Sequence, residues 1–453
     1  MDFNRNILKK MALWSAPRTK KPLILRGARQ VGKTTIVRQF SNQFEQYIEL
    51  NLELQEHQTL FESDLAFSEM VQRLFFSQNK SWSKKDKTLL FIDEIQESPK
   101  VIGFLRFFYE LEPTISIIAA GSMLETLFDT TLSFPVGRVE YLVLRPLCFS
   151  EYLNAIGENE AVEVMQQIPL PKFAESKLET FFNNFALIGG MPEVVKQYAS
   201  HRDLKQLSKI YNSLITSYMD DVEKYAHSSA QANYLRFIIK NMFANAGKRI
   251  TFERFSNSNY KSRDMAEGLR TLEKAMLVNL VYPTTQTELP LLTDNRKSPK
   301  LQVLDSGLLN FFVGIQSEIL GSTSIDTVYK GTLVEHLVGQ EMLSNQFETL
   351  ANLNFWVREK KGSMAEVDYI VNHNSKLIPI EVKSGKIGKL KSLMLYMEAT
   401  PHQLAVRIYS GNLHIEKIKT PAGKSFYLLN LPLYLSRYFM EYLDWFENEV
   451  KLL

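Results

Sequence analysis

The chain has 453 residues, more than a single hydrophobic core usually organises, so we expect two or three domains. Charged residues make up 23% of the sequence and apolar residues 45%, values typical of soluble globular proteins. The formal net charge of +3 neither demands nor excludes a nucleic-acid partner, because it allows a local basic patch but no strong overall field.

The sequence shows no sign of secretion or of a membrane span. The single cysteine, Cys148, excludes an internal disulfide framework and fits a reducing compartment. The first residues contain no apolar core of signal-peptide length, and no segment reaches the roughly 18 uninterrupted apolar residues of a membrane helix. We therefore expect a cytoplasmic protein with no membrane partner.

The stretch "KPLILRGARQVGKTTIVRQF" reads as a strand, a glycine-bounded loop and a helix. Four residues separate Gly27 from Gly32, and Lys33 and Thr34 follow, which matches the phosphate-binding loop in its required context. The glycines let backbone N–H groups turn onto phosphate oxygens, and the helix N-terminus adds partial positive charge. The residues expected to bind ATP are Gly27, Ala28, Arg29, Gln30, Val31, Gly32, Lys33, Thr34 and Thr35.

Within this loop Lys33 should reach the β- and γ-phosphates, and Thr34 should bind Mg²⁺. A second strand, in "TLLFIDEIQ", is apolar over 89–92 and ends in Asp93 and Glu94. At the carboxyl end of a parallel strand these carboxylates would face the phosphates. Asp93 suits Mg²⁺ and Glu94 suits orienting the attacking water. The simpler alternatives are a glycine turn and an acidic loop without a ligand.

Three further strands are predicted from their apolar patterns: 47–53, 116–123 and 139–147. With the two motifs they resemble the AAA-type ATPases, whose members insert a strand between the motifs and carry a glutamate beside the metal aspartate. The resemblance implies that Ser122, at the tip of the fourth strand, senses the γ-phosphate. It also implies that a late arginine, Arg138 or Arg145, reaches the nucleotide of a neighbouring subunit. A surface or ion-paired arginine is the alternative for each.

The stretches "PVGRVEYLVLRPLCFSEY" and "LIGGMPEVV" resemble, more specifically, a prokaryotic ATPase family whose members pair this domain with a C-terminal module of unknown function. We place the ATPase core at 1–150. Helical patterns over 151–204 would form the lid of that family, and "GGMP" predicts a helix stop and a turn.

The segment 205–322 has the pattern of three helices followed by two strands. The helices are expected at about 230–245, from Thr251, and from Ser262, and the strands lie in "LVNLVYPTTQTELPLL" and "KLQVLDSG". This order resembles a winged-helix domain, a common DNA-binding fold. The third helix carries as many acidic as basic residues, so DNA contact and a packing or protein-contact role both stay open. The residues that would line a DNA backbone are Lys248, Arg249, Lys261, Arg296, Lys297 and Lys300.

The segment 323–453 begins with a helix that carries Glu335. Three strands follow, in "NFWVREKK", "AEVDYIVN" and "KLIPIEVKS", and then a second helix. This order resembles the PD-(D/E)xK nuclease fold, an α/β domain like that of restriction endonucleases. Asp368, Glu381 and Lys383 match the motif of that fold, and Glu335 matches the helix glutamate that many members carry.

Asp368 and Glu381 on adjacent strands would form a carboxylate pair that requires a shared cation, and oxygen ligands favour Mg²⁺ or Mn²⁺. The metal would lower the pKa of a bound water, and Lys383 would hold that water or stabilise developing negative charge. The alternative is a local ion pair between Glu381 and Lys383 on an exposed strand face. Cleavage activity is a separate question that the motif leaves open.

The sequence as a whole predicts an α/β protein that hydrolyses ATP with Mg²⁺ and couples the nucleotide state to a nuclease-like, DNA-acting module. The alternative is a nucleotide-switched regulator that binds DNA or protein through a tail that does not cleave. ATP is the expected ligand, and DNA and further copies of the chain are open as partners. The residues expected to act in catalysis are Lys33, Glu94, Arg138, Glu335, Asp368, Glu381 and Lys383.

Overall fold

The computed structural model describes residues 3–62, 65–121, 135, 137–315, 331–358, 365–385 and 388–452. The chain forms two compact units. The first comprises Met1–Arg145 with two short segments, Lys274–Leu277 and Phe347–Leu350. The second comprises Pro146–Glu273, Val278–Gln346 and Ala351–Leu453.

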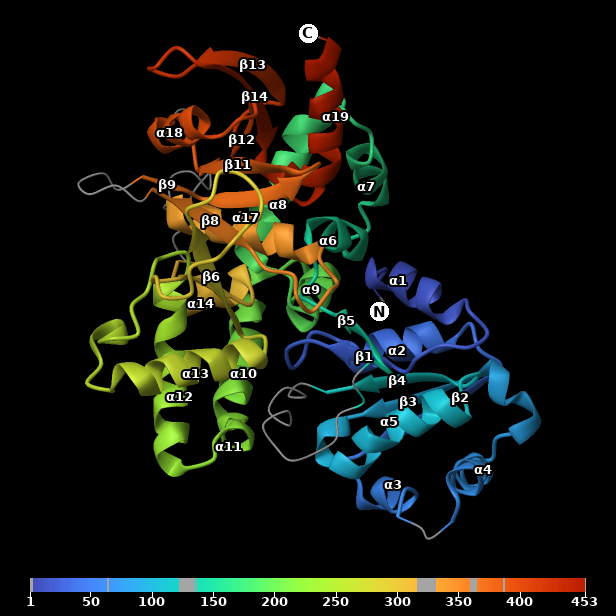
Figure 1. The fold of residues 1–453 in the computed structure, drawn as a ribbon. Coiled ribbons are helices and arrows are strands. Elements are labelled where there is room, and N and C mark those ends of the chain that lie inside the picture. The colour runs from blue at the N-terminus through green and yellow to red at the C-terminus, as the bar shows by residue number, and fades with distance from the viewer. Residues whose placement is uncertain are drawn as a thin grey trace. The chain divides into compact units, whose positions relative to one another are not determined.

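The first unit is built on a parallel five-stranded sheet in the order β2-β3-β4-β1-β5 (Figure 1). Its strands are β1 (Leu23–Arg26), β2 (Gln46–Asn51), β3 (Thr88–Asp93), β4 (Ser116–Ala120) and β5 (Glu140–Val143). All five strands predicted from the sequence are therefore present. The strand that separates β1 from β3 in the sheet is β4, whereas β2, which lies between the two motifs in the sequence, is an edge strand.

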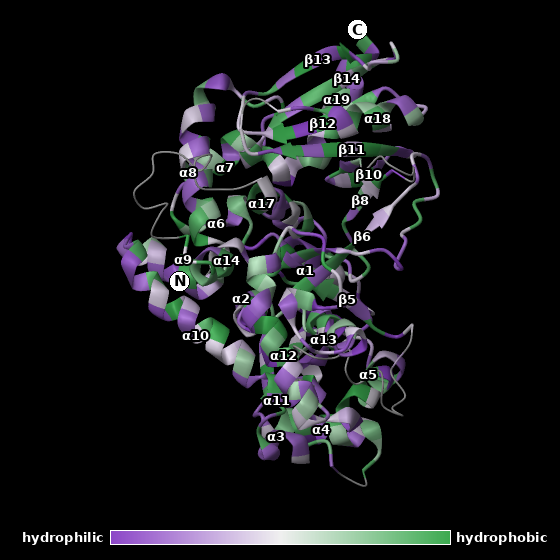
Figure 2. Cartoon of the chain, turned by 90° about the vertical axis from the view of Figure 1, so that its left-hand side faces the viewer, coloured by the Kyte–Doolittle hydropathy of each residue, from purple (hydrophilic) through white to green (hydrophobic). Residues whose placement is uncertain are grey.

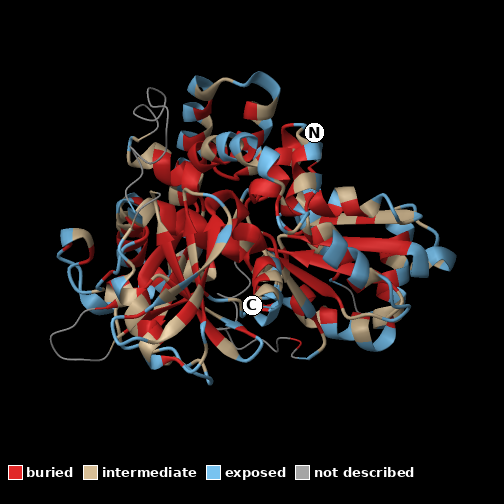
Figure 3. Ribbon diagram, turned by 90° about the horizontal axis from the view of Figure 1, so that it is seen from above, coloured by how far each residue is buried: buried red, intermediate tan, exposed pale blue. Residues whose placement is uncertain are grey.

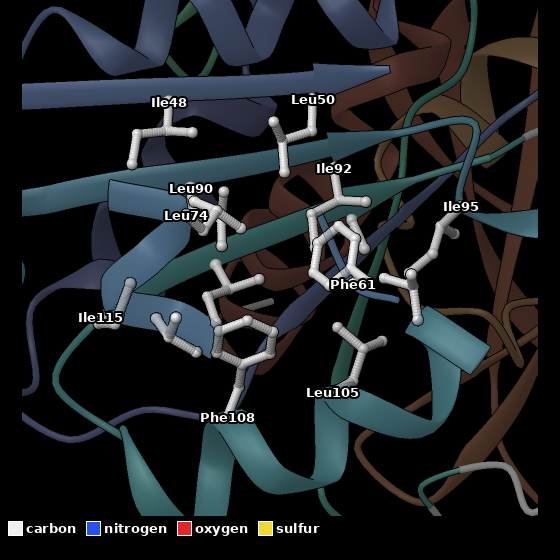
Figure 4. Packing of buried hydrophobic residues seen from close by; sticks show 14 of the residues in the cluster. Ile48, Leu50, Phe61, Leu74, Leu90, Ile92, Ile95, Leu105, Phe108 and Ile115 are labelled. Carbon is white, nitrogen blue, oxygen red and sulfur yellow. The ribbon is translucent and has the colours of Figure 1, made fainter. Parts of the chain in front are cut away.

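Helices cover both faces of this sheet. They are α1 (Ile7–Ser15), α2 (Lys33–Ser41), α3 (Gln55–Thr59), α4 (Phe67–Ser77) and α5 (Pro99–Leu111). On one face, Leu74 of α4 and Leu105 and Phe108 of α5 pack against Leu90 and Ile92 of β3 (Figure 4). On the other face, α2 packs against β3 and β4 (Figure 1). This double cover explains why every residue of β3 is buried. Figure 3 shows more generally that buried residues gather in the strands and that exposed residues lie on the outer helices and loops.

The second unit opens with a run of helices, several of them visibly amphipathic, such as α10 in Figure 2. They are α6 (Phe149–Ala155), α7 (Asn159–Met165), α8 (Glu175–Ile188), α9 (Pro192–His201), α10 (Leu207–Asp220), α11 (Val222–Tyr225), α12 (Ser229–Met242) and α13 (Ser262–Lys274). The helix stop predicted at "GGMP" is confirmed, since α8 ends at Ile188 and α9 begins at Pro192.

The turn between α8 and α9 is fixed by two other segments of this unit. The backbone N–H of Gly190 donates to Asp305 Oδ2 at 2.6 Å, and its carbonyl accepts from the backbone N–H of Leu147 at 2.7 Å. Asp305 is fully buried just before α14 (Ser306–Phe312) and also accepts from the N–H of Leu308, while burial raises its pKa to about 6. The turn is thus an internal junction rather than a surface loop.

The three helices predicted between residues 230 and 276 are only partly present. Those at 229–242 and 262–274 form, but the short helix expected from Thr251 is wrong, because only a 3₁₀ turn at Phe255–Asn257 lies there. The backbone of Arg254 and Ser256 is left-handed, which prevents an α-helix from propagating.

The two strands expected as a wing also differ from the prediction. β6 (Val278–Thr284) and β7 (Lys300–Val303) pair antiparallel, as expected. β6 then pairs in parallel with β8 (Asn354–Val357), which in turn pairs with β9 (Glu366–Val367), giving a four-stranded sheet in the order β7-β6-β8-β9. The predicted wing is therefore part of a sheet that it shares with the C-terminal region.

The C-terminal region contains a mixed five-stranded sheet in the order β10-β11-β12-β14-β13 (Figure 1). Its strands are β10 (Tyr369–His373), β11 (Lys376–Lys383), β12 (Leu404–Tyr409), β13 (His414–Lys419) and β14 (Ser425–Pro432), and its helices are α17 (Gly331–Ser344), α18 (Lys391–Ala399) and α19 (Phe439–Leu452). The expected order of helix, three strands and helix is present. β11 lies between β10 and β12 and is buried along its middle, not on an exposed face.

Within the described parts of the chain, no helix combines the length and the apolar character needed to cross a membrane.

Candidate functional site

The loop between β1 and α2 follows a path that depends on glycine. A Cβ on Gly27 would lie 2.4 Å from the carbonyl oxygen of Leu144, just beyond the end of β5, so only glycine fits there. Gly32 is left-handed, with φ of +97°, directly before the first residue of α2. The loop therefore passes close to the neighbouring strand and then turns sharply into the helix.

The ammonium group of Lys33 lies inside this loop. Its Nζ donates to the carbonyl oxygens of Gly27 at 2.9 Å and of Ala28 at 3.0 Å. Burial lowers the pKa of Lys33 to about 8, although Glu94 and Asp93 favour the charged form. The site thus holds a buried cation that a further negative charge would stabilise.

Thr34 and Asp93 meet across the gap between α2 and β3. Thr34 Oγ1 donates to Asp93 Oδ2 at 2.6 Å, and the backbone N–H of Glu94 donates to Asp93 Oδ1 at 3.0 Å. Asp93 is buried, and burial raises its pKa. A hydroxyl and a carboxylate oxygen so close together fit Mg²⁺, which proteins often hold through one or two such ligands and substrate phosphates.

Glu94 follows β3 in a left-handed backbone conformation, with φ of +50°. A non-glycine residue in this conformation is uncommon, and such residues cluster at functional sites. The amide Nε2 of Gln96 donates to Glu94 Oε2 at 2.6 Å, which orients the carboxylate.

The remaining predicted residues of the first unit are less well defined. Ser122 lies outside the described residues. Arg138 is ion-paired with Glu110, with its Nε 2.6 Å from the carboxylate. Arg145 is different, because its Nε is buried without a hydrogen-bond partner among the described residues, and burial lowers its pKa to about 10. Arg138 thus fits the ion-paired alternative weighed for it.

The predicted residues of the second unit do come together. Glu335 lies on α17, Asp368 lies at the bend between β9 and β10, and Glu381 and Lys383 lie on β11. The backbone N–H of Val382 donates to Asp368 Oδ2 at 2.7 Å. Lys383 Nζ donates to Glu381 Oε1 at 2.5 Å, whereas Glu381 Oε2 is buried and has no hydrogen-bond partner among the described residues.

One member of this cluster was not predicted for it. Lys300, expected on an exposed DNA-contacting edge, is instead buried. Its Nζ lies 2.5 Å from Glu335 Oε1, 2.7 Å from Glu366 Oε1 and 3.7 Å from Asp368 Oδ1. Glu366 was also missed. It lies two residues before Asp368, and residues two apart in an extended segment point to the same side, so the sequence pattern could have indicated that it belongs to the cluster.

Burial dominates the electrostatics of this cluster. Burial alone would lower the pKa of Lys300, but Glu335, Asp368 and Glu366 together raise it above its ordinary value. Burial and the nearby Asp368 raise the pKa of Glu335 to about 8 and that of Glu381 to about 7. Lys300 therefore stays charged, whereas the pKa values of Glu335 and Glu381 lie above the ordinary value of a glutamate.

The nuclease resemblance implies a divalent metal ion at this cluster, and the residues do not fit one. Across the described residues, no three acidic, histidine or cysteine side chains are arranged to hold a metal ion. Glu335 Oε1 instead accepts a hydrogen bond from the ammonium group of Lys300.

Three family models match separate parts of the chain. Residues 19–153 match an AAA domain, residues 179–319 match a domain of unknown function (DUF8612), and residues 330–434 match another domain of unknown function (DUF4143). The phosphate loop, Asp93 and Glu94 lie within the first match. The cluster around Lys300, called the acidic cluster below, is divided between the other two matches. Lys300 lies within the second, and the third contains Glu335, Glu366, Asp368, Glu381 and Lys383. No curated protein matches the chain.

Among solved structures, a Walker-type ATPase of Pyrococcus abyssi matches with 14% sequence identity and a TM-score of 0.44, over 69% of this chain and 96% of that one. The parallel sheet, the phosphate loop and the match at 19–153 together define the first unit as a P-loop ATPase domain of the AAA type.

Proposed function

We propose that this protein binds ATP with Mg²⁺ at the loop of residues 27–35, hydrolyses it, and couples the nucleotide state to the second unit. The observation that carries the proposal is the buried ammonium of Lys33 within a glycine-dependent loop, beside the Thr34–Asp93 pair. Burial disfavours the charged form of Lys33 and so lowers its pKa, and a polyanionic ligand beside the ammonium group would stabilise that charged form.

In this proposal each residue has one role. The backbone N–H groups of the loop and the ammonium of Lys33 bind the phosphate oxygens. Thr34 and Asp93 would hold the Mg²⁺ ion, which when bound neutralises charge on the phosphates. Glu94, held by Gln96, orients the attacking water and accepts its proton.

Two substitutions test these roles. A charge-assisted contact to phosphate contributes about 2–3 kcal/mol, so Lys33→Ala should weaken ATP binding by about 100-fold in calorimetry. Glu94→Gln should keep ATP binding and slow phosphate release by about 100-fold or more. The control is Lys87→Ala, which removes an exposed lysine paired with Glu45 and should change neither quantity. Turnover at the wild-type rate in Glu94→Gln would show that Glu94 does not position the water.

Assembly with further copies of the chain is part of the same proposal. Arg138 or Arg145 would then stabilise the phosphates bound by a neighbouring copy. Arg145→Ala and Arg138→Ala should each be compared with wild type for ATP binding and for turnover. A loss of turnover without a loss of binding supports action in trans, and unchanged turnover in both variants counts against it.

For the second unit two functions compete. The first is metal-dependent cleavage of DNA by Asp368, Glu381 and Lys383. The second is a tail that binds DNA or protein without cutting, and the ion pairs of Lys300 with Glu335 and Glu366 favour it. Incubation with plasmid and branched DNA and Mn²⁺ separates them. Cleavage that is lost in Lys383→Ala would support the first, whereas binding without cleavage would support the second.

A further inference from the structure

Lys300 reaches the acidic cluster from a strand outside the predicted nuclease-like motif. It is the first residue of β7, which pairs with β6, and β6 in turn pairs with β8 of the C-terminal region. β7 also contacts α17 directly, where Gln302 Nε2 donates to the carbonyl oxygen of His336. Its ammonium is buried and also lies 4.7 Å from the centre of the Phe355 ring on β8. The side chain is therefore held on several sides and is not a mobile surface lysine.

The carboxylates that would bind a metal ion are already bonded to protein donors. Glu335 Oε1 pairs with Lys300, Glu381 Oε1 pairs with Lys383, and Asp368 Oδ2 accepts a backbone N–H. A metal ion would have to lie about 2.0–2.6 Å from these oxygens, close to an ammonium group of the same sign. Two cations so close, in a buried site, repel each other strongly.

We propose that Lys300 is a built-in cation that takes the place of the divalent ion implied by the nuclease resemblance. The ammonium joins α17, through Glu335, to the β9–β10 segment, through Glu366 and Asp368. The cluster then stabilises the fold of the second unit and does not support metal-dependent cleavage. This inference goes beyond the proposed ATPase function and does not rest on ATP hydrolysis.

The inference predicts that removing Lys300 creates a metal site. Lys300→Met keeps an unbranched side chain of similar length but removes the charge. Glu335, Glu366 and Asp368 are not arranged around a metal ion while Lys300 is present, and without its ammonium group they can shift to bind a cation. Glu381 Oε2, which has no hydrogen-bond partner among the described residues, would become a further ligand. Mn²⁺ is the suitable probe, because it accepts carboxylate ligands and its free form is quantified by electron paramagnetic resonance.

The experiment uses the full chain without nucleotide, with Asp93→Asn in every sample to remove the metal ligand of the first unit. With Lys300 intact, we expect no Mn²⁺ site with a dissociation constant below about 1 mM. In Lys300→Met we expect one Mn²⁺ site with a dissociation constant at least tenfold below that limit. Adding Glu381→Gln to this variant should weaken the site. The control is Lys297→Met, which removes a lysine of the same segment near Asp294 and should create no site.

Removing a buried cation can lower stability, so heat denaturation with and without Mn²⁺ is the second measurement. Mn²⁺ should raise the melting temperature of Lys300→Met and leave that of the intact chain unchanged, because only a ligand that binds the folded state stabilises it. Equal shifts in both proteins would overturn the proposal. Tight Mn²⁺ binding by the Lys300-intact chain that Glu381→Gln abolishes would overturn it as well, whatever the stability of the variant.

Discussion

At the scale of single residues, Gly27 occupies a position in the phosphate loop that leaves no room for a side chain. A methyl group there would lie 2.4 Å from a backbone oxygen, so either the loop or the end of β5 must shift. We expect Gly27→Ala to cost about 1–3 kcal/mol of stability and to weaken ATP binding at least tenfold. Thermal denaturation and calorimetry measure the two effects.

The matched control is Gly103→Ala on α5, where an added Cβ meets nothing within 4 Å. It should leave ATP binding unchanged and raise stability by up to about 1 kcal/mol, because alanine is the better helix former. If the two alanine variants bind ATP equally well, the close approach of the loop to Leu144 is not needed for binding.

A buried carboxyl group gives a second prediction at this scale. Glu341 on α17 accepts the backbone N–H of Phe149, and burial raises its pKa to about 8 from 4.5, although Arg437 opposes the shift. The folded state therefore binds more protons than the unfolded state between pH 4.5 and pH 8. The stabilisation is complete below about pH 4.5 and is lost as the pH rises through 8.

Glu341→Gln resembles the neutral acid and cannot ionise. We expect wild type to lose thermal stability relative to this variant as the pH rises from 5 to about 9. Because other groups titrate in the same range, the measured quantity is the difference between the two melting temperatures at each pH. Glu441→Gln, an exposed change in the first turn of α19, should give a difference that does not vary in this way. A constant difference for Glu341→Gln would mean that its carboxyl group is already ionised.

At the scale of elements, the turn between α8 and α9 makes a clear prediction. A Cβ on Gly190 would lie 1.9 Å from the carbonyl oxygen of Leu147, which is backbone and cannot move alone. Gly190→Ala should therefore displace the turn and lower the stability of the second unit by about 3 kcal/mol, the upper end of what overpacking usually costs. Thermal denaturation followed by circular dichroism measures the loss.

Gly331→Ala is the control, because Gly331 is the exposed first residue of α17 and a Cβ there has open space. It should melt within about 1 kcal/mol of wild type. Equal melting of both variants would show that the contacts of the turn contribute little.

The elements also show what a sequence can predict. The strands β1 and β3 and the start of α2 follow from apolar runs and motif spacing, which are local signals. The pairing of β6 with β8 is not a local signal, because periodicity reports that a strand is buried but not which strand lies beside it. The helix expected from Thr251 does not form because the backbone of Arg254 and Ser256 is left-handed, which the spacing of apolar residues does not report.

The same limit applies to the sites. The loop from Gly27 to Thr34 is contiguous, so the sequence is enough to predict it. Lys300 lies 35 residues before Glu335 along the chain, and the two meet because β7 packs against α17, where Gln302 Nε2 also donates to the carbonyl oxygen of His336. A charged residue in a strand pattern is most often exposed, and the exceptions are those with buried partners.

At the scale of the whole molecule, coupling between the two units is the central prediction. If the nucleotide state acts on the second unit, ATP should change amide hydrogen exchange in α17 and β11 when hydrolysis is blocked by Glu94→Gln. Lys33→Ala should show no such change at an ATP concentration that saturates only Glu94→Gln, because it binds the ligand about 100-fold more weakly. Identical exchange in the second unit with and without ATP, in a protein shown to bind ATP, would contradict the proposed coupling. It would not count against ATP hydrolysis by the first unit.

The pairing of β6 with β8 has a consequence for how this chain can be divided. Separate domain models match the segments that contain these two strands, yet each strand completes the hydrogen bonds of the other. A fragment that begins at α17 would carry an open sheet edge and a group of buried acids deprived of their lysine, both of which favour aggregation or misfolding. We therefore expect the two segments to fold as one unit and not as two independent domains.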